Sequence, residues 1–440
     1  MQSSCDEGSE DAVKIWYCNH YAMPPGAGGA ERPVRLAEAL QDAGEQVLVV
    51  AAGRHHLYRE EPDEAPPVGD SLRTEVRGID FCLLGVARYQ GNGPGRLRNM
   101  RDFGAGLRRL ARQVEEGSEA RPDVVIYSSP HPFGIPAAVK VARRLGAAFV
   151  LEVRDLWPQS LVEIAGVQRW HPICLWAAYC VRVGHRAASR VIGVLPGVAA
   201  AAADAGIETV PGEVAYLPNG AKLQGPETVG ENPYASEFAE ARKRGKLVVA
   251  YTGSLGIANS MEQILDLAGV EAASGRRYHF FLIGSGLKRE ELQQRIASEG
   301  IDFVTLLPAV EKQQIPAVLQ DADAAVVVWK KLPLYRYGVS PNKLFDYFAA
   351  GVPVLWVGQT TPDPVVEAGA GWSVVPNDPP ALHEALQAAA STEANELREM
   401  GSRGRDYLRA NHDWKRLGAR FVELCRDVVA ADPQTESRHG

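Results

Sequence analysis

Short apolar runs alternate with stretches of helical periodicity along most of the chain. Between the first two runs, residues 30–42 carry Val34, Ala37 and Leu40 on one face, which predicts a helix. Strands that alternate with helices in this way form a parallel sheet covered on both faces. In the first half, the runs that predict strands are residues 14–18, 46–51, 81–84, 124–127, 148–153 and 191–195.

The same pattern starts again after residues 223–246, a stretch rich in Gly, Pro and charge. Strands are predicted at residues 247–251, 279–283, 303–306, 324–328 and 353–357, with helices between them such as residues 288–297. The sequence therefore predicts an α/β fold of two Rossmann-like, doubly wound parallel-sheet domains. Because such sheets bind ligands at the carboxyl ends of their strands, the domains are expected to face a central cleft.

The pattern also predicts the domain boundaries. Residues 1–222 are expected to form the first domain, 223–246 a connector, and 247–402 the second domain. Residues 403–430 are expected to form helices that pack back on the first domain. The polar tail at 431–440 is predicted to be disordered, because it cannot bury enough apolar surface.

Composition and charge argue against several classes of protein. A chain of 440 residues suggests two or three domains at about 150 residues each. The formal net charge of -7 gives no overall attraction to nucleic acid or anionic lipid, although local basic stretches could still act on one face. The six cysteines lack metal-ligand spacing and no secretory signal opens the chain, so we expect reduced thiols and a cytoplasmic location. The most lipid-like stretch, residues 173–183, is shorter than the ~20 apolar residues of a membrane-spanning helix.

Two glycine-rich loops lie between a predicted strand and a predicted helix. The first contains Gly28 and Gly29, and the second runs through residues 253–256. Glycines allow close backbone approach and helix-start amides attract phosphate, so the two loops together suit a diphosphate. The alternative for the first loop is an ordinary tight turn.

Residues 337–353 predict a loop, a helix that begins near Ser340 or Pro341, and a strand. Lys343 lies at the helix start, and Asp346 follows one turn later. A cation beside helix amides can neutralise a leaving diphosphate, and a carboxylate one turn deeper can accept both ribose hydroxyls. The alternative is a solvated Lys–Asp pair on the helix surface.

This segment resembles the carboxyl-terminal signature of family 4 of the retaining glycosyltransferases, which have the GT-B fold. Its sequence is Tyr-Gly-Val-Ser-Pro-Asn-Lys-Leu-Phe-Asp-Tyr-Phe-Ala-Ala-Gly-Val-Pro. Weaker pieces extend the resemblance over nearly the whole chain, at residues 217–220, 282–286, 321–323 and 404–407. Residues 151–158, and residues 88–93 followed by Arg96, resemble the branch of O-antigen and capsule transferases similar to N-acetylfucosamine transferases.

The resemblance implies a hexosyltransferase that retains anomeric configuration. Its donor would be a nucleoside-diphosphate sugar bound by the second domain, with UDP as the favoured nucleotide. The transferred group could be N-acetylhexosaminyl. Its acceptor, on the side of the first domain, would be a glycan or polyprenyl-pyrophosphate-linked molecule in lipopolysaccharide or exopolysaccharide synthesis, at the inner face of the membrane. The resemblance implies no cofactor and no required metal.

The chain departs from the family pattern at several positions. Gly338 and Asp346 stand where the family has two Glu separated by seven residues, so only the ribose role of the second carboxylate carries over. Ser254 and Asn259 stand where the family has a phosphate-binding Arg and Lys. Arg154 stands where the family has a sugar-contacting His.

We expect Lys343 and Arg154 to replace the missing cations, with Arg336 as a third candidate. The catalytic candidates are Lys343, Arg154 and Asp155. The donor-binding candidates are Gly28, Gly29, Gly253, Ser254, Leu255, Gly284, Val310, Ser340, Asn342, Lys343 and Asp346. The acceptor-side candidates are His131, Arg88 and Arg96, and no histidine has the spacing of a zinc site.

Residues 96–112 are strongly basic, and Leu97, Met100, Phe103 and Leu107 fall on one face of the predicted helix. One interpretation is contact with an anionic bilayer or with the pyrophosphate of a lipid-linked acceptor, and the other is a solvated helix face. The arginines are Arg96, Arg98, Arg101, Arg108, Arg109 and Arg112.

Three further interpretations stay open. Asp321 and Asp323 could hold a divalent cation that bridges a diphosphate. A sugar-nucleotide 2-epimerase on the same scaffold would need carboxylates and a histidine placed for proton abstraction. A non-catalytic subunit that has kept the scaffold would explain the departures at Gly338 and Arg154.

Overall fold

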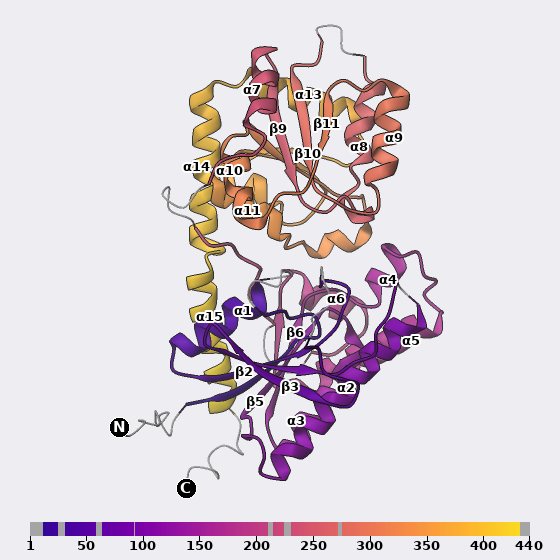
Figure 1. The fold of residues 1–440 in the computed structure, drawn as a ribbon, viewed down its shortest axis with the longest axis vertical. Helices are drawn as coiled ribbons and strands as arrows, with labels where there is room; N and C mark the ends of the chain where they lie inside the picture. The colour runs from indigo at the N-terminus through magenta and orange to yellow at the C-terminus, as the bar shows by residue number, and fades with distance from the viewer. Residues whose placement is uncertain are drawn as a thin grey trace. The chain divides into compact units, whose positions relative to one another are not determined.

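The computed structural model describes residues 12–24, 31–58, 64–91, 93–209, 214–223, 230–271 and 275–431. The chain divides into two compact units (Figure 1). The amino-terminal unit consists of Met1–Pro218 and Trp414–Gly440, and the carboxyl-terminal unit consists of Asn219–Asp413. Each unit is a largely parallel sheet between layers of helices, as the hydrophobic pattern predicts.

The amino-terminal unit is built on an eight-stranded sheet. Its strands are β1 (Lys14–Cys18), β2 (Gln46–Ala52), β3 (Ser71–Val76), β4 (Ile79–Leu84), β5 (Val124–Ser129), β6 (Ala148–Val153), β7 (Arg190–Gly193) and β8 (Ala215–Tyr216). They lie in the order β3-β4-β2-β1-β5-β6-β7-β8. β5 and β6 are buried along their whole length, because helices cover both faces of the sheet.

The edge strand β3 is absent from the sequence prediction, since its side chains alternate between exposed and half-buried. β3 pairs antiparallel with β4 through a turn at Arg77 and Gly78, which have φ of 55° and 78°. A two-residue turn with positive φ at both positions matches the twist of a hairpin. The predicted parallel sheet therefore has one antiparallel strand at this edge.

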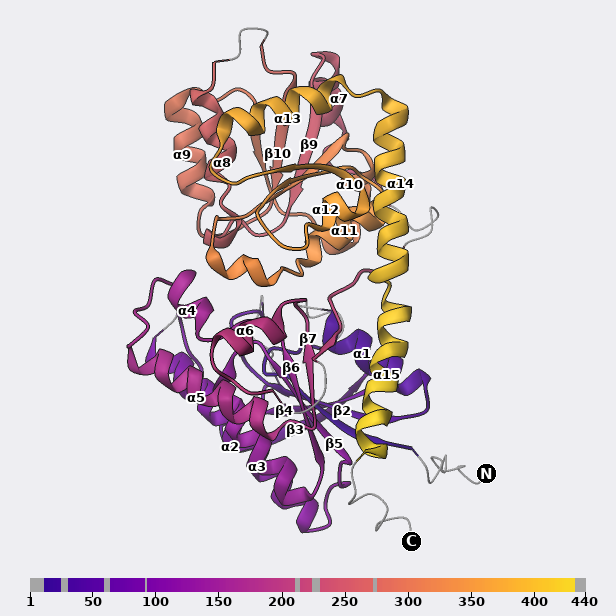
Figure 2. The same cartoon turned by 180° about the vertical axis from the view of Figure 1, so that it is seen from behind.

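Helices cover both faces of this sheet. They are α1 (Arg32–Asp42), α2 (Pro94–Glu115), η1 (Pro132–Gly134), α3 (Ile135–Leu145), α4 (Gln159–Glu163), α5 (Pro172–Ala187), α6 (Val198–Asp204) and α15 (Trp414–Ala430). α1 and α15 pack together on one face, where they share a core with alternate strand residues such as Tyr17 and Val49. α2, α3 and α5 form a layer on the other face (Figure 1, Figure 2).

The carboxyl-terminal unit is built on a six-stranded parallel sheet. Its strands are β9 (Leu247–Thr252), β10 (Tyr278–Ile283), β11 (Val304–Leu307), β12 (Ala324–Val328), β13 (Val354–Val357) and β14 (Gly371–Val374), in the order β11-β10-β9-β12-β13-β14. Its longer helices are α7 (Ala235–Lys243), α9 (Arg289–Glu299), α11 (Asn342–Ala350), α13 (Pro379–Ser391) and α14 (Ala394–Asn411). Its short helices are η3 (Ile257–Asn259), α8 (Glu262–Leu265), η4 (Asp266–Gly269), η5 (Lys312–Gln314), α10 (Ile315–Gln320), η6 (Pro333–Tyr337) and α12 (Pro364–Ala368).

Two helices lie near the predicted domain boundaries. α7 falls inside the predicted connector and packs on β9. α14 packs on α11 of the carboxyl-terminal unit, whereas α15 buries Trp414 and Phe421 in the core of the amino-terminal unit. The division between the units thus falls between α14 and α15, while the predicted boundary at residue 403 lies inside α14.

No described helix is both long enough and apolar enough to cross a bilayer. The cysteines in the described part of the chain are buried and form no disulfide; they are Cys18, Cys82, Cys174, Cys180 and Cys425.

Candidate functional site

The winding of the second sheet reverses at β9, which lies between β10 and β12. Ligands of doubly wound sheets bind at such a reversal, beyond the carboxyl ends of the strands. The loop that follows β9 begins at Gly253, and the loop that follows β12 contains Lys330 and Lys331. The second glycine-rich loop of the sequence analysis therefore lies at the reversal.

The loops after β9 and β10 pack tightly through two glycines. Gly253 has a φ of 146°, which side chains rarely adopt. A Cβ on Gly284 would lie 1.8 Å from the carbonyl oxygen of Gly253, so only glycine fits there. Leu255 is fully buried in the core of this unit, and its N–H donates to the carbonyl of Ser285 at 2.8 Å. Leu255 thus anchors the loop beneath its exposed neighbour Ser254.

Lys343, in the first turn of α11, reaches this loop. Its Nζ donates to the hydroxyl of Tyr251 at 2.8 Å and to Oδ1 of Asn259 at 2.6 Å. The Tyr251 hydroxyl and Nδ2 of Asn259 in turn both donate to the carbonyl of Ser254, at 2.7 and 2.8 Å. One connected network therefore holds the lysine against the loop. Burial lowers the pKa of Lys343 to about 7, so its charge depends on what lies beside it.

The other donor-side candidates surround α11. Asp346 is half-buried one turn after Lys343. The next residue, Tyr347, accepts a hydrogen bond from the N–H of Thr252 at 3.0 Å and so ties α11 to the end of β9. Asn342 is exposed at the helix start, and Val310 packs beside the core under β10.

Ser340 has a contact that the sequence does not predict. Its hydroxyl accepts from the backbone N–H of Asn219 at 2.9 Å, and its carbonyl accepts from Nδ2 of Asn219 at 2.8 Å. Ser340 therefore fixes the residue at which the carboxyl-terminal unit begins. The exposed side chain of Arg336 donates to the hydroxyl of its neighbour Tyr337.

The carboxylates of Asp321 and Asp323 are engaged away from this edge. Arg242 donates to Asp323 Oδ1 at 3.0 Å and to Asp321 Oδ1 at 3.5 Å. Asp323 Oδ2 also accepts from the N–H of Val248 at 2.7 Å, near the amino end of β9. The pair thus lies at the opposite end of the strands from Lys343. This arrangement argues against the diphosphate-bridging metal interpretation. No group of three or more potential metal ligands gathers anywhere in the described ranges.

The first sheet reverses at β1, which lies between β2 and β5. Asn19 follows β1, and its Nδ2 donates to the Ser128 hydroxyl near the end of β5 at 2.9 Å. The rings of His20 and His131 lie 4.7 Å apart, centroid to centroid. His131, the predicted acceptor-side histidine, is therefore at the reversal of its own sheet.

Aromatic and basic side chains gather around Tyr21. Its ring centroid lies 5.0 Å from that of His56, 5.3 Å from that of His55 and 5.6 Å from that of His131. Arg96, at the start of α2, donates to the Tyr21 hydroxyl at 3.0 Å. The structure thus places the two acceptor-side candidates His131 and Arg96 beside the same ring, together with His55 and His56.

His131 is neutral and lacks polar partners. Its side chain is 1% exposed, and neither ring nitrogen has a hydrogen-bond partner among the described residues. Burial, helped by the charge of Arg96, lowers the pKa of His131 to about 3. Burial, then His131 and His55, also lowers the pKa of His20. A neutral imidazole donates at one nitrogen and accepts at the other, which suits a hydroxyl group.

Arg88 lines a cavity beside this cluster. The cavity has a volume of about 650 Å³, within the range of small-ligand sites of ~300–1,000 Å³. His56 Nδ1 and the Tyr89 hydroxyl lie 2.8 Å apart on its wall. The described residues that line it are Arg54, His55, His56, Tyr58, Arg88, Tyr89 and Gln90.

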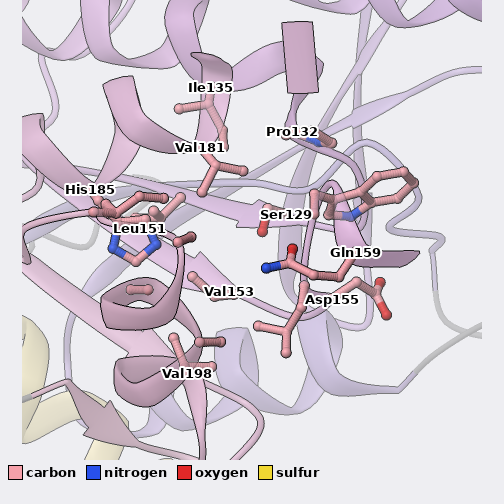
Figure 3. Close-up of a pocket in the computed structure, with 16 residues that line it drawn as sticks. Ser129, Pro132, Ile135, Leu151, Val153, Asp155, Gln159, Val181, His185 and Val198 are labelled. Carbon is pink, nitrogen blue, oxygen red and sulfur yellow. The ribbon is translucent and has the colours of Figure 1, made fainter. Parts of the chain in front are cut away.

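Arg154 and Asp155 directly follow β6. The Asp155 carboxylate is exposed and points away from a small pocket behind it, whereas the amide of Gln159 points inward (Figure 3). The pocket volume is about 30 Å³, too small for a sugar. His185 lies on its far side, and burial lowers the pKa of His185 to about 4. The Asp155 carboxylate is therefore presented outward, at the carboxyl edge of the sheet.

A buried ion pair, which the sequence analysis does not predict, supports this edge. Arg32, 1% exposed, donates to Glu152 Oε1 through Nη2 at 2.7 Å and through Nε at 3.0 Å. Arg32 also donates to the carbonyls of Leu217 and Pro218 at 2.9 and 2.6 Å. Tyr17 donates to Glu152 Oε2 at 2.8 Å. Burial alone would raise the pKa of Glu152, but the Arg32 guanidinium lowers it overall.

The basic helix α2 does not turn an apolar face outward. Met100, Phe103 and Leu107 are at most 5% exposed, because they pack into the unit. The exposed face carries Arg98, Arg101, Arg108 and Arg112. Any contact of α2 with a bilayer would therefore be electrostatic.

The predicted site residues are thus distributed over two edges. The catalytic candidate Lys343 lies in the carboxyl-terminal unit, and Arg154 and Asp155 lie in the amino-terminal unit. Gly28 and Gly29 lie outside the described residues. The sequence pattern does not predict Tyr251 as a partner of Lys343, nor the cluster of His20, Tyr21, His55 and His56. Each of these residues ends or follows a strand of a doubly wound sheet, which is the signal that could have identified them.

The two halves of the chain match two family models. Residues 27–220 match the Glycosyl transferase 4-like domain, and residues 235–407 match the Glycosyl transferases group 1 domain. The curated probable glycosyltransferase WbjE of Pseudomonas aeruginosa is 26% identical over 195 residues, 42% of this chain and 46% of that protein. The match thus spans less than half the length of this relative.

Solved structures share the fold. Sucrose-phosphate synthase from Thermosynechococcus elongatus aligns with a TM-score of 0.72 at 16% identity, over 95% of this chain and 100% of that chain. Anabaena HepE, solved in complex with UDP and glucose, aligns with a TM-score of 0.64 at 15% identity, over 94% and 99% of the two chains. Both matched domains are glycosyltransferase domains and follow one another in this fold, so the chain belongs to the family 4 glycosyltransferases with the GT-B fold.

Proposed function

We propose that the chain transfers a hexosyl group, N-acetylhexosaminyl included, from a UDP-linked sugar to a glycan or polyprenyl-diphosphate-linked acceptor in cell-surface polysaccharide synthesis. The observation that carries the proposal is the network that holds Lys343 Nζ 2.8 Å from Tyr251 and 2.6 Å from Asn259, against the Gly253 loop. Negative charge develops on the diphosphate when the anomeric bond breaks. A preorganised cation at that point is among the largest contributions to catalysis.

Lys343 stands in for cations that the chain lacks. The family's phosphate-binding Lys falls on Asn259, and Asn259 Oδ1 accepts a hydrogen bond from Lys343 Nζ. The ammonium of Lys343 is therefore within hydrogen-bond distance of Asn259, the residue that stands in place of the family's lysine. We infer that the lysine supplied from α11 binds the donor diphosphate together with the backbone amides of the loop. The side chain of Asp346, one turn further along α11, would accept the ribose hydroxyls.

The amino-terminal unit supplies groups suited to sugar hydroxyls. Both nitrogens of the buried His131 are unsatisfied among the described residues, and a sugar hydroxyl at either nitrogen would satisfy it. The N-acetylfucosamine transferase-like branch remains part of the proposal and depends on residues 151–158 and 88–93. Peripheral contact with the inner face of a membrane remains part of it as well.

The proposed reaction breaks the bond between the anomeric carbon and the donor phosphate oxygen. The acceptor hydroxyl forms the new bond on the same face, and its proton passes to the departing diphosphate. Lys343 stabilises the charge on that diphosphate. Neutral His131, with its low pKa, is a poor base at neutral pH and would orient a hydroxyl instead.

The low pKa of His131 also argues against the 2-epimerase alternative, because that reaction needs a histidine and carboxylates for proton abstraction. UDP as the donor nucleotide is supported by HepE, which shares the fold and has been solved with UDP and glucose.

The test measures UDP release from UDP-sugars with and without a polyprenyl-diphosphate-linked sugar. Release that depends on acceptor, with a glycosylated product in mass spectrometry, is the expected result. Epimerised UDP-sugar formed without acceptor would establish the epimerase. Calorimetric donor binding without turnover on a verified acceptor would establish a non-catalytic subunit.

A further inference from the structure

An apolar surface lies on the amino-terminal unit between α4 and α5. Of the twelve exposed large apolar side chains in the described part of the chain, five fall within residues 164–179. Their exposed fractions are 42% for Ile164, 67% for Trp170, 59% for Leu175, 40% for Trp176 and 57% for Tyr179. These five residues are called the α4–α5 surface below. Exposed large apolar side chains gathered in so short a segment are typical of a contact site.

α5 presents two distinct faces. Cys174, Ala177 and Cys180 are buried against the unit. Leu175 and Tyr179 lie one turn apart on the opposite side, and the exposed Arg182 and Arg186 continue the same line at helical spacing. The side of α5 that faces outward is therefore apolar and aromatic in its first half and basic in its second.

Basic residues predominate near this surface, and Glu163 at the end of α4 is the carboxylate that precedes it in the sequence. Residues 164–203 contain four arginines, Arg169, Arg182, Arg186 and Arg190, and no Asp or Glu, in a chain whose net charge is -7. Leu97 and Met100 of α2 share one apolar cluster with Ile173 and Ala177 of α5, so the first turns of the two helices are neighbours. The exposed Arg98 and Arg101 of α2 therefore extend the basic region.

We propose that the α4–α5 surface, flanked by the arginines of α5 and α2, docks the chain on an anionic lipid bilayer. The inference deepens the proposed function and rests on it, since a polyprenyl-linked acceptor lies in such a bilayer. Trp and Tyr side chains settle at the headgroup level, and Leu and Ile reach the acyl boundary. Arginines around them meet the lipid phosphates.

A second copy of this chain fits the surface less well. A two-fold contact would place the same patch on both sides, so residues 164–203 of one copy could offer the arginines of the other no carboxylate partner. Like charges across an interface are unfavourable. The absence of acidic residues across residues 164–203 thus favours phosphate headgroups over a second copy.

The test measures co-sedimentation of the full chain with vesicles of phosphatidylcholine, with and without phosphatidylglycerol. The variant is Trp170→Ser/Leu175→Ser/Tyr179→Ser, whose exposed positions leave stability nearly unchanged. The matched control is Val68→Ser/Val366→Ser, which removes apolar side chains that are 53% and 64% exposed elsewhere. We expect binding to phosphatidylglycerol vesicles to fall about tenfold or more in the variant and to stay at the wild-type level in the control.

A second measurement follows tryptophan emission. Wild-type emission should shift to the blue on phosphatidylglycerol vesicles, and Trp170→Phe/Trp176→Phe should remove the shift. Added salt should weaken binding, because headgroup attraction is screened. Arg182→Glu/Arg186→Glu should lose the preference for phosphatidylglycerol.

Equal vesicle binding by the wild type and the triple variant would overturn the proposal. The proposal would also be overturned if light scattering showed a dimeric wild type and a monomeric triple variant while vesicle binding stayed the same. UDP affinity is measured separately, without vesicles. No UDP binding by the wild type would refute the proposed function. Wild-type UDP affinity in the triple variant would show that the substitutions affect bilayer docking and not donor binding.

Discussion

The carboxyl ends of the two sheets have opposite chemical character. In the carboxyl-terminal unit, the edge at β9 carries Lys343 in a hydrogen-bonded network with Tyr251 and Asn259. In the amino-terminal unit, the edge at β1 carries the rings of His20 and His131, whose pKa values are lowered by burial. The same point in the winding thus holds a lysine amine in one unit and neutral imidazoles in the other.

The difference shows how one scaffold provides two kinds of binding edge. The reversal of strand order provides an open edge in each sheet, and the residues that end or follow the strands determine its polarity. A diphosphate requires a cation and amides, whereas sugar hydroxyls require neutral groups that both donate and accept. The buried carboxylate of Glu152, at the first edge, is neutralised by its ion pair with Arg32.

The largest expected effect concerns this buried pair. Arg32→Ala would leave Glu152 buried without its partner, which costs about 3–5 kcal/mol of unfolding free energy. The matched control is Arg35→Ala on the same helix, whose ion pair with Glu38 is partly exposed and contributes about 0–1 kcal/mol. Urea unfolding followed by circular dichroism measures both. Equal losses in the two variants would show that the pair does not organise the first edge.

The next effect tests the cation of the second edge. Lys343→Ala should lower kcat by about 10²-fold or more, the size of losing one preorganised electrostatic group, while circular dichroism and melting stay near wild type. Lys331→Ala, an exposed lysine in the loop after β12, is the control. Near-normal kcat in a folded Lys343 variant would remove the residue from catalysis and direct attention to Arg154 or Arg336.

The fold could be predicted where burial is complete. The predicted strands at residues 148–153 and 324–328 coincide with β6 and β12, whose residues are all buried. The sequence does not predict the edge strand β3, because its side chains alternate between exposed and half-buried. Such a segment resembles a loop of mixed polarity.

The site could be predicted only where one segment contains it. Lys343 and Asp346 belong to one continuous motif, so the sequence identifies both. The cluster around Tyr21 draws His55 and His131 from loops after different strands, and only the strand order brings them together. Arg32 and Glu152 are separated by 120 residues, so no local pattern could reveal their pairing.

Donor binding should depend on the carboxylate of α11. Asp346→Ala should weaken UDP binding by about 1–3 kcal/mol, because buried ribose hydroxyls would lose their acceptor. Isothermal titration calorimetry with UDP measures the change. Asp346→Asn retains one acceptor oxygen and should lose less. Unchanged UDP affinity in the alanine variant would remove Asp346 from the site.

The two edges should also respond differently to pH. Burial lowers the pKa of Lys343 from 10.5 to about 7, so the unfolded chain binds the extra proton between these values and stability should rise with pH across that window. Donor binding has the opposite sign, because an anion beside the ammonium raises its pKa. UDP binding should therefore take up a proton, and UDP affinity should fall as pH rises above 7.

Calorimetry of UDP binding near pH 8.5, in buffers of different ionisation enthalpy, measures this uptake, since nucleotide phosphates with a pKa of about 6 are already ionised there. Nearly one proton is expected for the wild type and nearly none for Lys343→Met. The neighbouring Tyr251 does not contribute, because burial raises its pKa. Equal uptake in both proteins would assign the proton to another group.

The smallest expected effect is that of a chelator. The diphosphate is neutralised in this proposal by Lys343 and by loop amides, and the carboxylates that could hold a metal are engaged elsewhere. Asp321 and Asp323 pair with Arg242 near the amino ends of β9 and β12, at the far end of the strands from the glycine loop. Treatment with EDTA should therefore leave most of the transferase activity, and Asp321→Asn should leave UDP affinity unchanged.

The measurement is UDP release before and after dialysis against EDTA, with manganese and magnesium added back separately. Complete loss of activity that manganese restores would overturn this prediction. It would mean that a metal supplies the positive charge here assigned to Lys343, and the large kcat effect expected for Lys343→Ala should then shrink.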